Sequence, residues 1–196
     1  MARIYIDRRY FAGNERKWVS FESSPRLEKT KKNIYGKCVP CITNLYEQLQ
    51  AGKTEIRLSS AFRCWKIVVQ APDMDTCIDF LDTLEKDTPD DMYVRGRFGS
   101  GDESKSTKVI VFNADSDAEK DEIRHRVKAT ASRFDPELPV ACHKACADLY
   151  HELLGDWREW KEIQPIRKPE AVRHILERIR KVLFWERKEG AEIDQG

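Results

Sequence analysis

Apolar residues between positions 38 and 50 recur at the spacing of an amphipathic α-helix. They stand at i, i+3, i+4, i+7 and i+11, so one helix face carries them all: Cys38, Cys41, Ile42, Leu45 and Leu49. Ala51-Gly52 follows, and glycine commonly ends a helix. Two short strands are predicted before this helix, at Arg3–Ile6 and Trp18–Phe21.

The middle of the chain contains four segments with strand-like patterns. Phe62–Gln70 is rich in β-branched and aromatic residues, and Met92–Phe98 alternates in polarity. Thr107–Asn113 is a nearly continuous apolar run, which is typical of a buried interior strand. Leu138–Ala141 supplies a short fourth strand.

Two amphipathic helices are predicted between these strands. Asp73 can cap the first helix, and Ser116 with Glu119 forms a capping box at the start of the second. The first helix has a single apolar face made of Met74, Cys77, Ile78, Leu81 and Leu84. The second buries Ile123, Val127, Ala131 and Phe134.

The predicted order β-α-β-β-α-β is that of the ferredoxin-like fold, an α+β arrangement with two helices on one face of a four-stranded antiparallel sheet. Right-handed crossovers would place the strands at 62–70 and 107–113 in the centre of the sheet. We therefore expect a ferredoxin-like core at 61–142. The N-terminal strand–helix extension covers 1–60 and the C-terminal helical extension covers 143–196, all packed as one body.

The C-terminal extension shows two further helical patterns. His143–Leu154 precedes Gly155, and Pro169 suits the first position of a final helix. The apolar face of that helix contains Val172, Ile175, Leu176, Ile179, Val182 and Leu183. Such faces usually cover the protein's own core.

The chain is highly charged but almost neutral overall. Of its 196 residues 35% are charged, with 35 Lys and Arg against 34 Asp and Glu. The first 60 residues hold 12 basic and 6 acidic side chains, whereas residues 61–115 hold 7 and 11. This distribution permits a polyanion-facing N-terminal region, although many domains separate charge this mildly without binding a charged partner.

The sequence also bears on the compartment. It contains no apolar run of transmembrane length, and its start lacks the apolar block of a signal peptide. We therefore expect a cytoplasmic protein with no membrane partner. In a reducing compartment the six cysteines are thiols or metal ligands rather than disulfides.

Two cysteine pairs have the spacing of metal ligands. Cys38 and Cys41 form a C-x-x-C pair, and Cys142 and Cys146 lie about one helical turn apart. Together the four thiolates could hold zinc or an iron–sulfur cluster. The first pair is also similar to the C-x-P-C of thioredoxin-like proteins, but there the motif follows a buried strand and here it follows the polar segment 29–37. Cys64 and Cys77 are predicted to face the core.

The hairpin formed by the predicted strands at 92–98 and 107–113 suggests nucleic-acid binding. Arg95, Arg97 and Phe98 could combine phosphate contacts with stacking, and Lys105 and Lys108 continue the basic segment. The segment is similar to the basic-Gly-aromatic opening of the RNP1 motif in RNA-recognition motifs, without the aromatic pattern that follows there. A flexible loop with solvated charges would explain the same residues.

A third cluster lies at 142–152, where thiols, His143, His151 and Glu152 are concentrated. A small enzyme centred on this segment is possible on composition, although geometry decides catalysis. The leading hypothesis is a non-catalytic nucleic-acid-associated or regulatory module, with RNA favoured over DNA. The alternatives are the metal protein, the small enzyme, and a structural partner of another protein without chemistry of its own.

Overall fold

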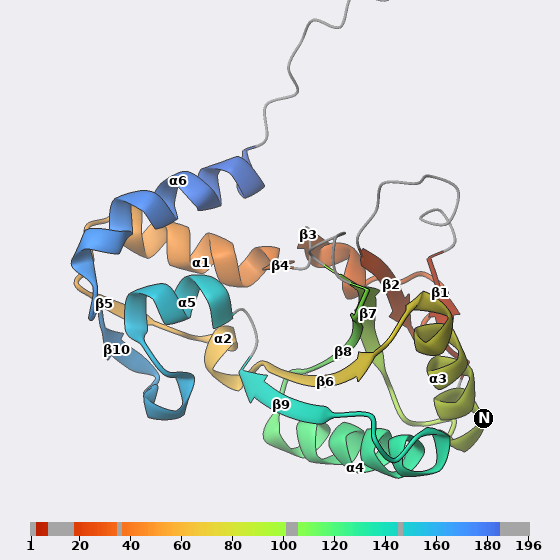
Figure 1. Ribbon diagram of the computed structural model, residues 1–196. Coiled ribbons are helices and arrows are strands. Elements are labelled where there is room, and N and C mark those ends of the chain that lie inside the picture. The colour runs from red at the N-terminus through yellow and green to blue at the C-terminus, as the bar shows by residue number, and fades with distance from the viewer. Residues whose placement is uncertain (1–2, 8–17, 35–36, 101–105, 145–146, 185–196) are drawn as a thin grey trace, which may run out of the picture.

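A computed structural model describes residues 3–7, 18–34, 37–100, 106–144 and 147–184. The protein is a mixed α+β structure with one large antiparallel sheet and two separate hydrophobic cores (Figure 1).

The large sheet has six strands in the order β1-β2-β7-β8-β6-β9. Neighbouring strands are antiparallel throughout. The bounds are β1 (Tyr5–Ile6), β2 (Trp18–Glu22), β6 (Trp65–Ala71), β7 (Arg95–Gly99), β8 (Lys108–Ala114) and β9 (Val140–Lys144). The sheet is wider than the four strands expected, because β2 pairs along the whole of β7 and β1 pairs with β2. The predicted strand at 107–113 is interior, as expected.

Helices α3 (Met74–Asp87) and α4 (Asp117–Phe134) cover one face of this sheet (Figure 1). Both start at the predicted caps: the Asp73 carboxylate accepts from the Thr76 backbone N–H, and the Ser116 hydroxyl accepts from that of Glu119. The first core fills the space between sheet and helices. Its fully buried side chains include Phe21, Ile67, Phe80, Phe98, Ile110 and Phe112.

The second core is built by the two ends of the chain. It joins α1 (Val39–Gln50), α2 (Ser60–Arg63), α5 (Ala147–Leu154) and α6 (Val172–Leu183). The short strands β5 (Glu55–Arg57) and β10 (Ile163–Pro165) pair beside these helices. A further two-stranded ribbon, β3 (Asn33–Ile34) and β4 (Lys37–Cys38), leads into α1. The division at 60/61 and 142/143 stays a prediction.

Several predicted boundaries are wrong, among them the start of β6 and the end of β9. Phe62 and Arg63 belong to α2, so β6 begins only at Trp65. His143 and Lys144 extend β9, because the register with β6 continues to the pair Trp65–Lys144. The helix expected from 143 therefore starts later. None of the helices within the described ranges is both long and apolar enough to cross a membrane.

Candidate anion-binding cavity

A cavity of about 360 Å³ lies against the face of the sheet opposite α3 and α4. Side chains alternate between the two faces of a strand. Phe98 and Phe112 belong to the first core, so Arg97 and Asn113 point to the other side. The sheet contributes Lys66, Arg95, Arg97 and Asn113 to the lining, and Asp115 follows directly after β8. Segments outside the sheet contribute Lys29, Lys32, Cys38, Pro40, Cys41, Ser60, Arg63 and Cys64.

The start of α1 forms one wall of the cavity. Cys38 is the N-cap residue, makes no side-chain cap hydrogen bond, and is followed by Pro40 in the first turn. The N-terminus of a helix carries a partial positive charge and backbone N–H groups without intrahelical partners. The Tyr150 hydroxyl donates to the Cys41 carbonyl at 2.9 Å and thereby fixes this turn to α5. The helix end therefore adds to the positive potential of the cavity.

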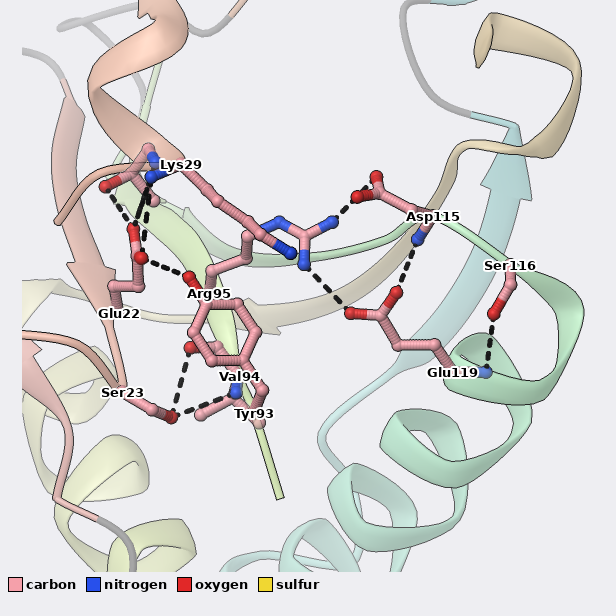
Figure 2. Close-up of polar contacts among 10 residues, drawn as sticks. Glu22, Ser23, Lys29, Tyr93, Val94, Arg95, Asp115, Ser116 and Glu119 are labelled. Carbon is pink, nitrogen blue, oxygen red and sulfur yellow. Dashed lines mark hydrogen bonds and ion pairs between the residues drawn. The ribbon is translucent and has the colours of Figure 1, made fainter. Parts of the chain in front are cut away.

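A second wall is held in place by a buried carboxylate on β2. Glu22 is 1% exposed and accepts hydrogen bonds from the backbone N–H groups of Lys29 and Thr30, at 3.1 and 3.0 Å. The Thr30 hydroxyl donates to the same carboxylate. The Tyr93 hydroxyl also donates to it (Figure 2). Burial and this bond to Glu22 raise the pKa of Tyr93 well above its usual value. Because of these contacts, the segment 29–32 stays against the sheet with Lys29 and Lys32 at the cavity.

Arg95 lies at the edge of the cavity where two carboxylates are found. Its side chain is 6% exposed and pairs with Asp115 at 2.7 Å and with Glu119 at 2.9 Å (Figure 2). Burial acts to lower the pKa of Arg95, but the two carboxylates outweigh it and the pKa lies above its ordinary value. Glu119 also accepts from the Asp115 backbone N–H at 2.7 Å. Arg95 therefore ties β7 to the start of α4.

The basic side chains make the lining of the cavity predominantly positive. Among the described residues, six Lys or Arg and one carboxylate line it, and Arg95 is the one that pairs with Asp115 and Glu119. The five remaining cations are Lys29, Lys32, Arg63, Lys66 and Arg97. Two of them lie over aromatic rings: Arg97 is 4.7 Å from the Trp18 centroid and Lys29 is 4.8 Å from that of Tyr93. Gathered positive charge in a concave site attracts anions.

The predicted hairpin residues do not form one surface. Arg95 and Arg97 line the cavity, but Phe98 is fully buried in the first core and its ring is not exposed for stacking. Lys108 lies on the helix-covered face of β8, because it shares the parity of Ile110 and Phe112. Lys105 lies outside the described residues.

The predicted metal ligands are also separated. Cys38 and Cys41 line the cavity, whereas Cys142 pairs in register with Ile67 and packs on the opposite face, where burial raises its pKa. Cys146 lies outside the described residues. Within the part of the chain that the structure covers, no group of three or more Cys, His, Asp or Glu side chains is placed to hold a metal ion.

The cluster at 142–152 is divided between two elements, β9 and α5. Tyr150 is fully buried in the second core, and the His151 ring packs against Trp160 with the ring centroids 5.3 Å apart. Glu152 pairs with Arg178 of α6 and lies 3.4 Å from the His174 ring. Tyr150, His151 and Glu152 therefore have partners in or beside the second core, and none of the described residues of this cluster lines the cavity.

Sequence reasoning identified four of the described lining residues, Cys38, Cys41, Arg95 and Arg97, and missed the other nine. Cys64, expected in the core, lines the cavity, and so do Lys66 and Arg63. Strand parity was the signal available: in Arg-Gly-Arg-Phe the two arginines share a face that the phenylalanine cannot share. Lys29 and Lys32 carry no such signal, because Glu22 positions their segment through tertiary hydrogen bonds.

Comparison of the chain with models of protein families, with curated proteins and with solved structures finds no match.

Proposed function

We propose that this protein is a non-catalytic module that binds single-stranded nucleic acid, RNA in preference to DNA, with backbone phosphate in the cationic cavity. The observation that carries the proposal is that, within the described part of the chain, six basic side chains and one carboxylate line a cavity on the sheet. Phosphate contacts supply most of the affinity of such proteins.

The size and surroundings of the cavity favour a nucleotide unit as its occupant. A volume of about 360 Å³ is at the lower end of the range for small-molecule sites, roughly 300–1,000 Å³. Trp18, under the Arg97 guanidinium, is half-buried and lies beside the same face of the sheet. An aromatic ring next to a basic groove is the usual arrangement for binding single strands.

The proposal includes two further points. We assign strands β7-β8-β6-β9 with α3 and α4 to a ferredoxin-like unit whose sheet is widened by β2 and β1, since the strand order and the two helices on one face agree with that arrangement. A cytoplasmic location, where RNA is abundant and thiols stay reduced, belongs to the same proposal.

The test measures binding to labelled single-stranded RNA and DNA pools of about 12 nucleotides across a salt titration. The variant Lys66→Ala/Arg97→Ala removes two lining cations. We expect its affinity to fall roughly tenfold at low salt, and the slope of log K against log salt to become shallower by about 0.7 for each phosphate that the variant no longer neutralises.

The matched control is Lys108→Ala/Lys128→Ala, which removes the same charge from the helix-covered face and from α4. At about 0.1 M salt it should bind within a factor of about two of the wild type, because charges beyond a Debye length of about 10 Å are then largely screened. A wild-type affinity that does not respond to salt, or a control variant that binds as weakly as the cavity variant, contradicts the proposal.

A further inference from the structure

Three thiols share the cavity with the cations. Cys38, Cys41 and Cys64 all line it, although RNA binding gives them no role. Two of them occupy related positions in α1: Cys38 is the N-cap, and Cys41 is the third helical residue. The two positions are three residues apart across the first turn, and side chains at that spacing lie on the same helix face. The two thiols can therefore meet without any break in the helix.

The two thiols differ in access. Cys38 is half-buried at the cavity wall, whereas Cys41 is 2% exposed and its Sγ lies 3.7 Å from the Ser60 Oγ. A small disulfide that enters the cavity meets Cys38 first. Cys41, on the same turn of α1 and nearly inaccessible to solvent, is the thiol that would attack a sulfur bound to Cys38.

We propose that Cys38 and Cys41 form a thiol–disulfide exchange site whose preferred substrates are small disulfides bearing carboxylates. The Cys38 thiolate attacks one sulfur of the disulfide RSSR, the S–S bond breaks, and one RS⁻ leaves and takes up a proton. The Cys41 thiolate then attacks the Cys38 sulfur and releases the second RS⁻, which also takes up a proton. Two electrons pass from the dithiol to RSSR, which gives one protein disulfide and two RSH.

The substrate class follows from the charge of the lining. Basic side chains surround the thiols, so an anionic disulfide is concentrated at Cys38 and a cationic one is repelled. This inference does not depend on RNA binding, because it concerns the cavity's charge and the two thiols alone.

The experiment compares glutathione disulfide, which is anionic, with cystamine, which is cationic, as oxidants of the reduced full-length protein. We expect glutathione disulfide to react at least about tenfold faster at low salt, and the ratio to shrink as salt is added. Peptide mapping should find the Cys38–Cys41 disulfide, with two equivalents of small thiol released. Equal rates, faster reaction with cystamine, or a disulfide that includes another cysteine overturns the proposal.

Variants separate the two roles. Cys41→Ser should stop at a mixed disulfide on Cys38 and release one equivalent, and Cys38→Ser should react more than tenfold more slowly. Cys142→Ser removes a half-buried thiol from the opposite face and should behave as the wild type does. If Cys41→Ser fails to fold, the ratio of the wild-type rates with glutathione disulfide and cystamine, together with the mapped disulfide, still tests the proposal. Absence of RNA binding with an intact exchange reaction would reject the proposed function alone.

Discussion

The ion pairs of Arg95 allow a quantitative test of how the cavity corner is held together. Arg95→Met keeps most of the apolar stem but removes the charge that bridges Asp115 and Glu119. Removing one partner of a fully buried pair costs about 3–5 kcal/mol. Here Asp115 is 62% exposed and Glu119 25%, so water can solvate the carboxylates left behind. We expect the free energy of unfolding to fall by about 2–3 kcal/mol.

Double-mutant cycles divide this destabilisation between the two carboxylates. The Arg95–Glu119 bond, at 2.9 Å with both partners mostly buried, should give a coupling energy of about 1.5–3 kcal/mol. The Arg95–Asp115 pair, although shorter at 2.7 Å, should give less than about 1 kcal/mol because Asp115 is exposed. The assay is urea unfolding followed by tryptophan fluorescence for Arg95→Met, Glu119→Gln, Asp115→Asn and the two double variants. A larger coupling to Asp115 than to Glu119 would refute the reasoning that burial decides the strength of these pairs.

Three further predictions concern local features. Gly96→Ala should destabilise the protein by about 3 kcal/mol in urea unfolding, because the added Cβ would lie 1.9 Å from the Val111 carbonyl oxygen; a change below about 1 kcal/mol would contradict this. The hydrogen bond from the Thr76 backbone N–H lowers the pKa of Asp73 below its ordinary value of 3.8. The stabilisation that this cap gives is therefore complete above pH 3.8 and is lost as the pH falls through the folded pKa. Asp73→Asn should flatten this part of the curve of stability against pH, and an unchanged curve would contradict the capping role of Asp73. Burial raises the pKa of Cys77 to about 12, so iodoacetamide at mildly alkaline pH should label Cys38 well before Cys77, as mass spectrometry of the native protein can show.

The elements predicted from the sequence are those with strong local signals. Asp73 and Ser116 cap α3 and α4 as their sequence patterns indicate, and the apolar stripe from Cys38 to Leu49 predicts α1. The interior position of β8 follows from its continuous apolar run. In each case the signal is contained in a dozen or so neighbouring residues.

The addition of β1 and β2 to the sheet could not be predicted from local sequence patterns. β2 joins β7 through long-range pairs such as Phe21 with Gly96, and no local pattern specifies that partner. The predicted core position of Cys64 is wrong for a related reason: Phe62 and Arg63 form the end of α2, so the residue that follows is a helix cap at the cavity rather than a strand residue facing the core.

The cavity itself depends on tertiary structure. Its cations come from segments up to about 70 residues apart, between Lys29 and Arg97, and the carboxylate of Glu22 is needed to bring the first of them to the sheet. The hairpin pattern indicates Arg95 and Arg97 correctly as members of one surface. It could not exclude Phe98 and Lys108 without the parity that the sheet imposes.

The most direct test of the central claim is to map where RNA contacts the protein. Photocrosslinking with 4-thiouridine-labelled single-stranded RNA, followed by peptide mass spectrometry, should place the crosslinks in segments 29–32, 60–66 and 95–97 around the cavity. Crosslinks concentrated on α4 or α6, with none in these three segments, would contradict the account.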